Sequence, residues 1–318
     1  FFLTMTEDHT IEDVKEYYGK VLSNTNDLQT NACTCSSAPP ERIRKALSNV
    51  HDEIKNRYYG CGLTIPVDDL KGLKILDLGC GAGQDCYIVS QLVGEQGQVV
   101  GVDMTDEQIT IAQEYVEHHA KVFGYSSPNT RFIKGYIEKL DELDLESEYF
   151  DIIISNCVIN LSPDKESVLK QAYRLLKPGG ELYFSDVYAT RRVPDELVKN
   201  KVLFGECLSG ALYYNDFIRL AHKSGFIDPR LVSSSRITIN NKEIEELIGY
   251  IPFYSAVYRL WKLDNLETLC EDYGQAIRYK GTIPGESKSY SLDNHHLFET
   301  GKIELVCGNS FAMLHDTR

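Results

Sequence analysis

The sequence predicts an α/β protein: a doubly wound parallel sheet with N-terminal helices and a small, mainly β C-terminal appendage. Two observations support this fold class. Between residues 71 and about 190, short apolar runs alternate with segments of helical periodicity. A glycine-rich turn, residues 79–83, follows the first of these apolar runs directly. Strands that alternate with helices favour a parallel sheet, whose ligand lies at the carboxyl ends of the strands.

A helical segment and a loop, residues 1–70, are expected before the sheet. Apolar residues recur at helical spacing over residues 11–21 and 41–56, so both stretches should be helices. The loop at residues 57–62 places Cys61 between two glycines and close to two tyrosines. Such an adaptable backbone suits a lid or a substrate loop, and an ordinary turn with a buried cysteine fits the local sequence equally well.

The central domain, residues 71–263, should contain five parallel strands and their connecting helices. We expect the strands at residues 74–78, 98–103, 131–135, 150–155 and 181–186. Helices are expected at residues 85–93, 105–123 and 165–176, and Thr105 and Gln108 have the spacing of a capping box.

The sheet should be closed by two antiparallel strands. A helical insertion is expected at about residues 191–224, followed by β runs at 230–239 and 253–263 with a polar helix at 242–248 between them. Residues 264–318 form the appendage, and the sequence assigns it no role.

Composition excludes several classes of function. The net charge of −14 argues against sequence-independent binding of nucleic acid, because such binding depends on Lys and Arg side chains that neutralise phosphates. No apolar run approaches the roughly 18 to 20 residues of a membrane span, and the first ten residues lack the features of a secretory signal. Nine cysteines spread through a chain of 318 residues do not form a disulfide framework, so we expect a cytoplasmic protein with reduced thiols.

The glycine-rich turn identifies the kind of cofactor. A dinucleotide fingerprint would need its third glycine at position 84, which is Gln84, and that absence counts against a nicotinamide cofactor. The turn resembles the cofactor loop of class I S-adenosylmethionine-dependent methyltransferases. Asp103 ends the next apolar strand, 20 residues after Gly83, where a carboxylate can accept hydrogen bonds from both ribose hydroxyls.

We therefore expect a cofactor site at the carboxyl ends of the first four strands. Ile137 and Glu138, just after the third strand, are placed to flank an adenine. Cys80 and Cys86 are interpreted as packing residues. The residues expected to bind the cofactor are Tyr59, Gly60, Asp77, Gly79, Gly81, Gly83, Asp103, Met104, Ile137, Glu138 and Asn156.

A thiol stands where the substrate is expected. Asn156 at the end of the fourth strand is followed by Cys157, without the prolines that shape an amine pocket in base-methylating enzymes. Cys61 and Cys207 come from segments that cover the reactive end of the cofactor, and three convergent thiols indicate a soft, thiophilic centre.

Three alternatives remain open at this point. A zinc site could recruit Cys33 or Cys35, although structural zinc favours closely spaced ligand pairs. A methyltransferase for a small organic nucleophile would need an acid or base, for which Tyr59 and His51 are the candidates. A metal-sensing or redox module would bind a thiophilic ion without methyl transfer.

Five segments closely match arsenite methyltransferases. They are residues 58–63, 75–79, 155–161, 180–188 and 205–208, and the likeness runs from about residue 11 to 263. The resemblance implies a Rossmann-like class I methyltransferase in which Cys61, Cys157 and Cys207 bind trivalent arsenic. It also implies that Cys33 takes part in a redox cycle by pairing with Cys61.

The resemblance also implies a mechanism. Three thiolates hold As(III), and its lone pair attacks the methyl group of S-adenosylmethionine. Transfer formally oxidises arsenic, so an external thiol reductant, thioredoxin or glutathione, must return electrons through protein thiols. The implied role is arsenic detoxification or biotransformation.

Overall fold

The computed structural model describes residues 7–18, 39–198, 200, 203–204 and 206–317. Its centre is a twisted sheet with the strand order β3-β2-β1-β4-β5-β8-β7, and β6 pairs with β5. The first five strands of this order run parallel, and β8 runs antiparallel to both of its neighbours, β5 and β7. The strands are β1 Lys74–Leu78, β2 Gln98–Asp103, β3 Thr130–Lys134, β4 Phe150–Asn156, β5 Leu176–Ala189, β6 Leu212–Tyr213, β7 Arg230–Arg236 and β8 Phe253–Trp261.

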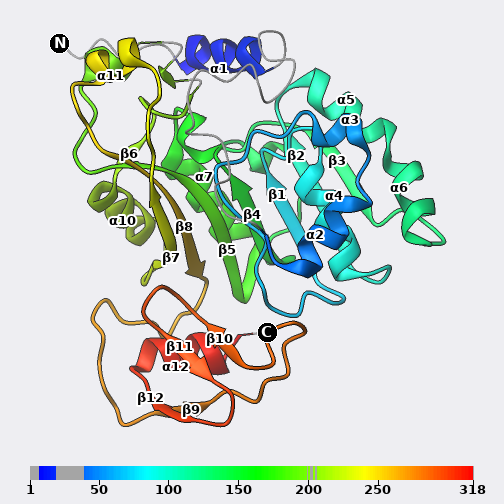
Figure 1. Ribbon diagram of the computed structural model, residues 1–318, viewed down its shortest axis with the longest axis vertical. Coiled ribbons are helices and arrows are strands. Elements are labelled where there is room, and N and C mark those ends of the chain that lie inside the picture. The colour runs from blue at the N-terminus through cyan, green and yellow to red at the C-terminus, as the bar shows by residue number, and fades with distance from the viewer. Residues whose placement is uncertain (1–6, 19–38, 199, 201–202, 205, 318) are drawn as a thin grey trace.

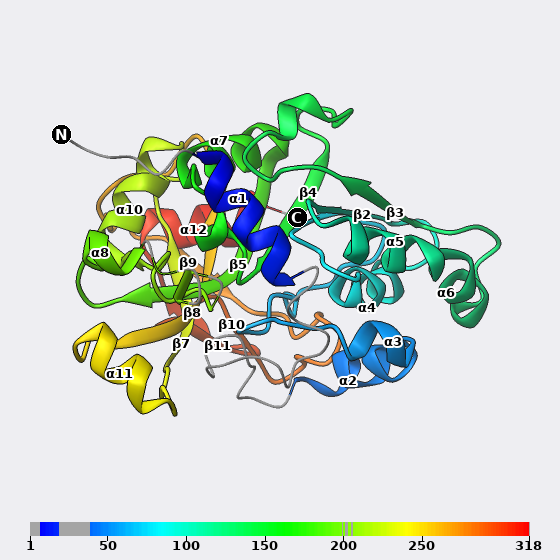
Figure 2. The same cartoon turned by 90° about the horizontal axis from the view of Figure 1, so that it is seen from above.

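Helices cover both faces of this sheet, as the sequence predicts. One apolar core lies on the face covered by α2 (Glu41–Ser48), α4 (Gln84–Val93) and α5 (Asp106–Glu114). A second core lies on the face covered by α7 (Lys165–Leu175) and α10 (Tyr214–Lys223). The fold class, a doubly wound α/β sheet closed by an antiparallel hairpin, is confirmed, and Figure 2 shows the two helical layers from above.

Two predicted helices are broken where local hydrogen bonding interrupts them. The stretch 41–56 divides into α2 and α3 (Asp52–Lys55), because the His51 ring accepts a hydrogen bond from the Glu53 backbone N–H and starts a new helix. The stretch 105–123 divides at Tyr115 into α5 and α6 (Val116–Phe123).

The predicted capping box at Thr105 and Gln108 is wrong. The Thr105 side chain caps nothing; its backbone N–H donates instead to the Asp103 carboxylate at 2.9 Å. Gln108 donates to the Tyr18 carbonyl, at the end of the N-terminal helix α1 (Glu7–Glu16). Both residues line the pocket that is described below.

The insertion and the closing hairpin follow the prediction in outline. The region 191–224 is helical in α8 (Asp195–Val198) and α10, with the short strand β6 between them. The hairpin forms from β7 and β8, and α11 (Lys242–Ile248) connects them. Strand β5 is longer than predicted, because it continues to Ala189 along the full length of β8.

Residues 264–317, which we call the C-terminal unit, contain four short strands and a helix. Strand β9 (Ala276–Arg278) pairs with β12 (Ile303–Leu305), and β10 (Ser289–Ser291) pairs with β11 (Leu297–Glu299). The sequence did not predict the helix α12 (Gly308–His315). The C-terminal unit has an apolar core of its own, which packs against Trp261 at the end of β8.

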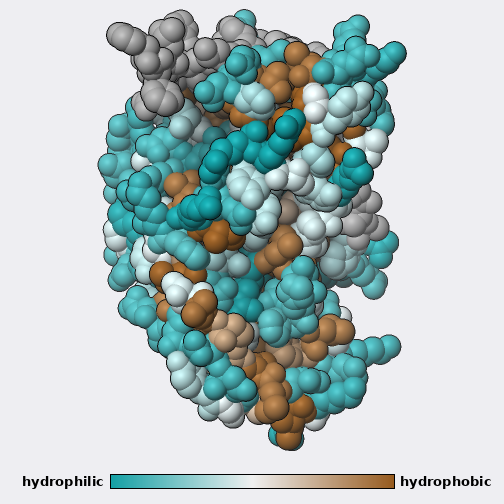
Figure 3. All heavy atoms as spheres, turned by 90° about the vertical axis from the view of Figure 1, so that its left-hand side faces the viewer, coloured by the Kyte–Doolittle hydropathy of each residue, from teal (hydrophilic) through white to brown (hydrophobic). Residues whose placement is uncertain are grey.

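The C-terminal unit lies below the amino ends of the parallel strands, at the end of the molecule opposite to α1 (Figure 1). The Arg259 guanidinium, 5% exposed, joins the unit to the sheet: it donates to the Glu181 carboxylate and to the Tyr290 hydroxyl. Apolar atoms gather on the lower part of one face of the molecule (Figure 3). In the C-terminal unit, Leu297, Ile303 and Leu305 are exposed. Among the helices that the structure describes, none is both long and apolar enough to cross a membrane.

Candidate active site

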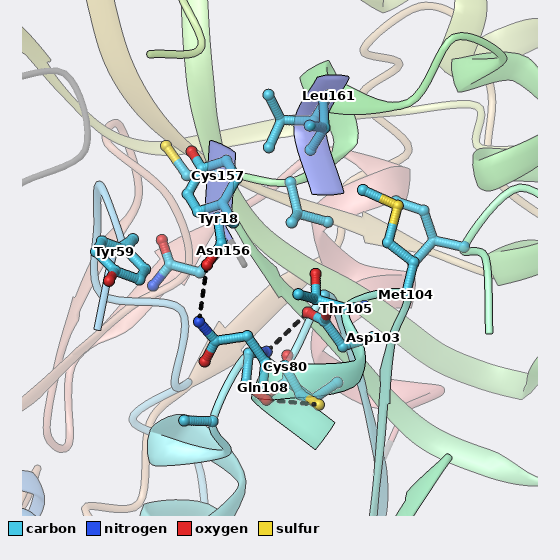
Figure 4. Close-up of a pocket in the computed structure, with 18 of the residues that line it drawn as sticks. Tyr18, Tyr59, Cys80, Asp103, Met104, Thr105, Gln108, Asn156, Cys157 and Leu161 are labelled. Carbon is cyan, nitrogen blue, oxygen red and sulfur yellow. Dashed lines mark hydrogen bonds between the residues drawn. The ribbon is translucent and has the colours of Figure 1, made fainter. Parts of the chain in front are cut away.

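A pocket opens at the carboxyl ends of β1, β2 and β4, beneath α1. It is lined by the glycine-rich turn, by residues 103–108 and 135–138, and by the end of β4. Figure 4 shows Cys157 next to Asn156 on one side of the pocket and Asp103 with Thr105 on another. From α1, Ile11 and Val14 complete the lining.

The glycine-rich turn forms a cradle that side chains would fill. Gly79 and Gly81 have φ values of +71° and +51°, a region that favours glycine. A Cβ on Gly79 would collide with Val158, whereas a Cβ on Gly81 would project into open space at the pocket wall. Gly83 does not line the pocket; with φ at +90° it begins α4 and packs against Phe132.

Two buried acids lie beside this turn. Asp103 accepts hydrogen bonds from the backbone N–H groups of Gly81 and Thr105, each at 2.9 Å, and burial raises the pKa of its carboxyl. Asp77 accepts a hydrogen bond from the Cys86 thiol at 3.2 Å. Burial, with the neighbouring Asp85 carboxylate, raises the pKa of Asp77 well above its usual range. Cys86 is fully buried, as expected of a packing residue.

The pocket fits S-adenosylmethionine on two grounds. The glycine turn leaves room for a ligand to approach the backbone, and Asp103 lies at its edge. In the part of the chain that the structure describes, Oε1 of Glu138 and Oε1 of Gln108 are buried at the pocket without a hydrogen-bond partner. Buried acceptors normally have partners, so these two oxygens match the amino and hydroxyl donors of an adenosine.

Asn156 fixes the loop that carries Cys61 onto the end of β4. Its Oδ1 accepts hydrogen bonds from the backbone N–H groups of Cys61 at 3.0 Å and Gly62 at 3.3 Å. Its Nδ2 donates to the Tyr58 hydroxyl at 2.7 Å and to the Gly62 carbonyl at 2.9 Å. The amide that we expected to bind cofactor is thus also the main anchor of the glycine-flanked loop.

The three predicted arsenic ligands meet at the edge of this pocket. A disulfide joins Cys61 to Cys157, with 5.7 Å between their Cα atoms. The Cys207 thiol donates to the Cys157 carbonyl at 3.4 Å. All three side chains are buried in one apolar cluster. The sequence did not predict the disulfide between Cys61 and Cys157. Cys33 and Cys35 lie outside the described residues, so the pairing of Cys33 with Cys61 stays a prediction.

Cys157 and Cys207 share an unusual backbone conformation. Their φ values are +58° and +61°, and among the described residues only Glu148 and Tyr250 also combine a side chain with positive φ. Such conformations cost about 1–3 kcal/mol and concentrate at functional sites. The strain is therefore consistent with a chain that holds two sulfur atoms in a required position.

Charged groups surround the Cys207 end of the cluster. Burial lowers the pKa of the Lys165 ammonium group to about 8. The neighbouring Asp186 carboxylate and the Cys207 sulfur act in the opposite direction and raise this pKa. Burial raises the pKa of Asp186 to about 6, although Asn160 and Val187 donate hydrogen bonds to this carboxylate. A cation close to a thiol favours its thiolate form.

The structure thus brings together most residues that the sequence singled out. Tyr59, Gly60, Asp77, Gly79, Gly81, Asp103, Met104, Ile137, Glu138, Asn156 and Cys157 line the pocket, and Cys61 and Cys207 pack behind it. His51 does not; it caps α3 and stacks on Tyr115. Sequence reasoning missed Gln108, Lys165 and Asp186, because single polar residues inside helices or strands carry no pattern.

Comparisons with known proteins show what this chain is similar to. A family described as "Methyltransferase domain" matches residues 69–242. The chain is 56% identical to an arsenite methyltransferase of Aquipseudomonas alcaligenes, over 96% of this chain and 88% of the relative. It is 50% identical to the human arsenite methyltransferase, over 96% of this chain and 81% of that one.

A solved crystal structure is also similar to this chain. The crystal structure of CrArsM, an arsenic(III) S-adenosylmethionine methyltransferase from Chlamydomonas reinhardtii, is similar with a TM-score of 0.85 and 51% sequence identity. The likeness covers 88% of this chain and 93% of that one.

Proposed function

Because the chain belongs to the arsenite methyltransferase family of S-adenosylmethionine-dependent enzymes, we propose that it methylates trivalent arsenic held by the thiolates of Cys61, Cys157 and Cys207. The observation that carries the proposal is the convergence of these three cysteines. They come from the loop before β1, the end of β4 and the insertion after β5, yet they pack together at one edge of the cofactor pocket. Soft thiolates are the ligands that a thiophilic centre prefers.

The chain's own groups account for the remaining chemistry. S-adenosylmethionine supplies a methyl group on a positively charged sulfur, and the arsenic lone pair is the nucleophile. No general base is needed, because arsenic has no proton to lose. The loop anchored by Asn156 shields the site from water.

Methyl transfer raises arsenic from As(III) to As(V), so two electrons must return for a trivalent product. A pair of thiolates supplies them by forming a disulfide, and an external thiol reductant, thioredoxin or glutathione, restores the thiols. Cys61 and Cys157 are bonded to each other in the structure, so this bond must be reduced before both bind arsenic. Cys33 is the further thiol that we assign to this cycle, as the partner of Cys61.

We assign the parts of the chain accordingly. Residues 71–263 form the methyltransferase domain, with the arsenic-binding insertion at about 191–224, and residues 1–70 supply the N-terminal helices and the Cys61 loop. The substrates are arsenite and methylated arsenicals, in a cytoplasmic detoxification or biotransformation of arsenic.

The test is an assay with methyl-labelled S-adenosylmethionine, arsenite and a thiol, in which label should move to an arsenical. Cys157→Ser and Cys207→Ser should abolish transfer and leave the affinity for S-adenosylhomocysteine within about threefold of wild type, because neither sulfur holds the glycine turn. Cys270→Ser, which changes an exposed thiol of the C-terminal unit, is the matched control. Transfer retained in both active-site variants would reject the proposal, and transfer without arsenite would favour an organic substrate.

A further inference from the structure

Two cysteines of the C-terminal unit lie together outside the active site. Cys270 is exposed in the loop before β9, and Cys307 is the residue that begins α12. The loop runs alongside the start of that helix: the Gly308 N–H donates to the Glu271 carbonyl at 2.8 Å. Asn309 adds a second connection, because its side chain accepts from the Glu267 N–H at 2.8 Å and donates to the Glu267 carbonyl at 2.7 Å.

Two donors face the Cys307 sulfur: the Ser310 backbone N–H at 3.5 Å and Nη2 of Arg230 at 3.9 Å. The Cys307 thiol itself donates to the Ser310 hydroxyl at 3.4 Å. Burial opposes ionisation, but the hydrogen bonds from Ser310 and the Cys270 thiol outweigh it and lower the pKa of Cys307 to about 7. A lowered pKa favours the reactive thiolate form.

Cys270 has the complementary environment. Hydrogen bonding to the Cys307 side chain, and then burial, raise the pKa of the Cys270 thiol. The Cys307 sulfur of this pair lies 3.9 Å from Nη2 of the Arg230 guanidinium. Arg230 is held in place by Asp228 at 2.7 Å and Asp293 at 3.0 Å.

A cavity of about 390 Å³ opens at Cys270, whereas the buried Cys307 is not among the residues that line it. Cys270, Arg230 and Asn309 line it, with no residue of the active-site pocket among its walls. The C-terminal unit lies at the amino ends of the strands, whereas the active-site cysteines lie at the carboxyl ends (Figure 1). The two thiol sites are consequently separate.

We propose that Cys270 and Cys307 form a second arsenical-binding site, a dithiol that chelates a trivalent arsenical carrying one organic substituent. With phenylarsine oxide as ligand, two arsenic–sulfur bonds replace the arsenic–oxygen bond, and the two thiol hydrogens leave with that oxygen as one water. Arsenic stays trivalent, so no oxidant or reductant takes part. Two thiols satisfy the two open valences of such an arsenical, which a lone cysteine does not. The site does not rest on the proposed methyl transfer.

The test counts arsenic bound to the full-length, fully reduced protein. The protein is loaded with phenylarsine oxide, washed with a monothiol that removes singly bonded arsenic, and measured by elemental analysis. Cys270→Ser, Cys307→Ser and the double variant should each retain one arsenic fewer per chain than wild type, because all three lose the same chelate. Serine also caps helices well, so Cys307→Ser keeps the start of α12.

Matched controls separate this site from the active site. Cys207→Ser should leave the equivalent bound by Cys270 and Cys307 in place, and Cys270→Ser should leave methylation of arsenite unchanged. Wild-type stoichiometry in the double variant overturns the proposal. A loss of one arsenic per single variant and two in the double variant also overturns it, since that pattern means two independent thiols. Unfolding midpoints within about 2 °C of wild type show that the C-terminal unit remains folded in each variant.

Discussion

Replacing Asn156 by Ala should release the loop that carries Cys61. The change removes the acceptor of the Cys61 and Gly62 backbone N–H groups and the donor to Tyr58 and to the Gly62 carbonyl. Each such hydrogen bond contributes about 0.5–1.5 kcal/mol, so the four together stabilise the docked loop by about 2–6 kcal/mol. That energy corresponds to a loss of about 30- to 20,000-fold in the docked population.

The disulfide between Cys61 and Cys157 reports this population directly. Its equilibrium constant against glutathione should fall by the same factor in Asn156→Ala, and kcat/KM for arsenite should fall with it. The affinity for S-adenosylhomocysteine should fall by a smaller factor, because Asn156 is only one of the residues expected to bind the cofactor and Asp103 and the glycine turn are untouched. Ser185→Ala is the matched control: its hydroxyl lies 3.4 Å from the Cys61 sulfur without binding the loop backbone. An unchanged glutathione equilibrium in Asn156→Ala would refute the reasoning.

Three further predictions concern the rest of the chain. Asp103→Ala should weaken S-adenosylhomocysteine binding by about 10- to 150-fold in calorimetry, because a hydrogen bond to a charged group contributes about 1.5–3 kcal/mol. A loss of affinity smaller than about fivefold would contradict the cofactor-binding role of Asp103. Gly79→Ala should lower the thermal midpoint more than Gly72→Ala, since both have positive φ but only the first meets Val158. Burial lowers the pKa of His119 to about 4, and Nε2 of its neutral ring accepts a hydrogen bond from the His51 backbone N–H. The unfolded chain, with a His pKa of about 6.5, therefore binds a proton at a higher pH than the folded protein does. The free energy of unfolding should fall as the pH falls from about 6.5 to about 4. Urea unfolding at several pH values should show this loss in wild type and a smaller one in His119→Gln.

The strands and the cofactor turn could be predicted from the sequence because their signals are local. An apolar run that ends in glycines or an acid marks β1 and β2 to the residue. The breaks at His51 and Tyr115 could not be predicted, because the apolar periodicity continues through both positions.

The arrangement of the site needed the structure. Cys61 and Cys157 are 96 residues apart, and no spacing rule shows that they are bonded. Asn156 was placed correctly at the end of β4, but its hold on the Cys61 loop arises from tertiary contacts alone. The proximity of Cys270 to Cys307 could not be predicted either. Cys270 lies in an irregular loop, and Cys307 begins a helix that the sequence did not predict.

The number of sulfur atoms around bound arsenic tests the central claim most directly. Arsenic K-edge X-ray absorption on the fully reduced protein, loaded with one equivalent of arsenite in the Cys270→Ser background, should show three sulfur neighbours and no oxygen. Cys207→Ser in the same background should show two sulfur atoms and one oxygen. Fewer than three sulfur neighbours in the Cys270→Ser protein, or a spectrum that the added Cys207→Ser change leaves unchanged, would contradict the three-thiolate site.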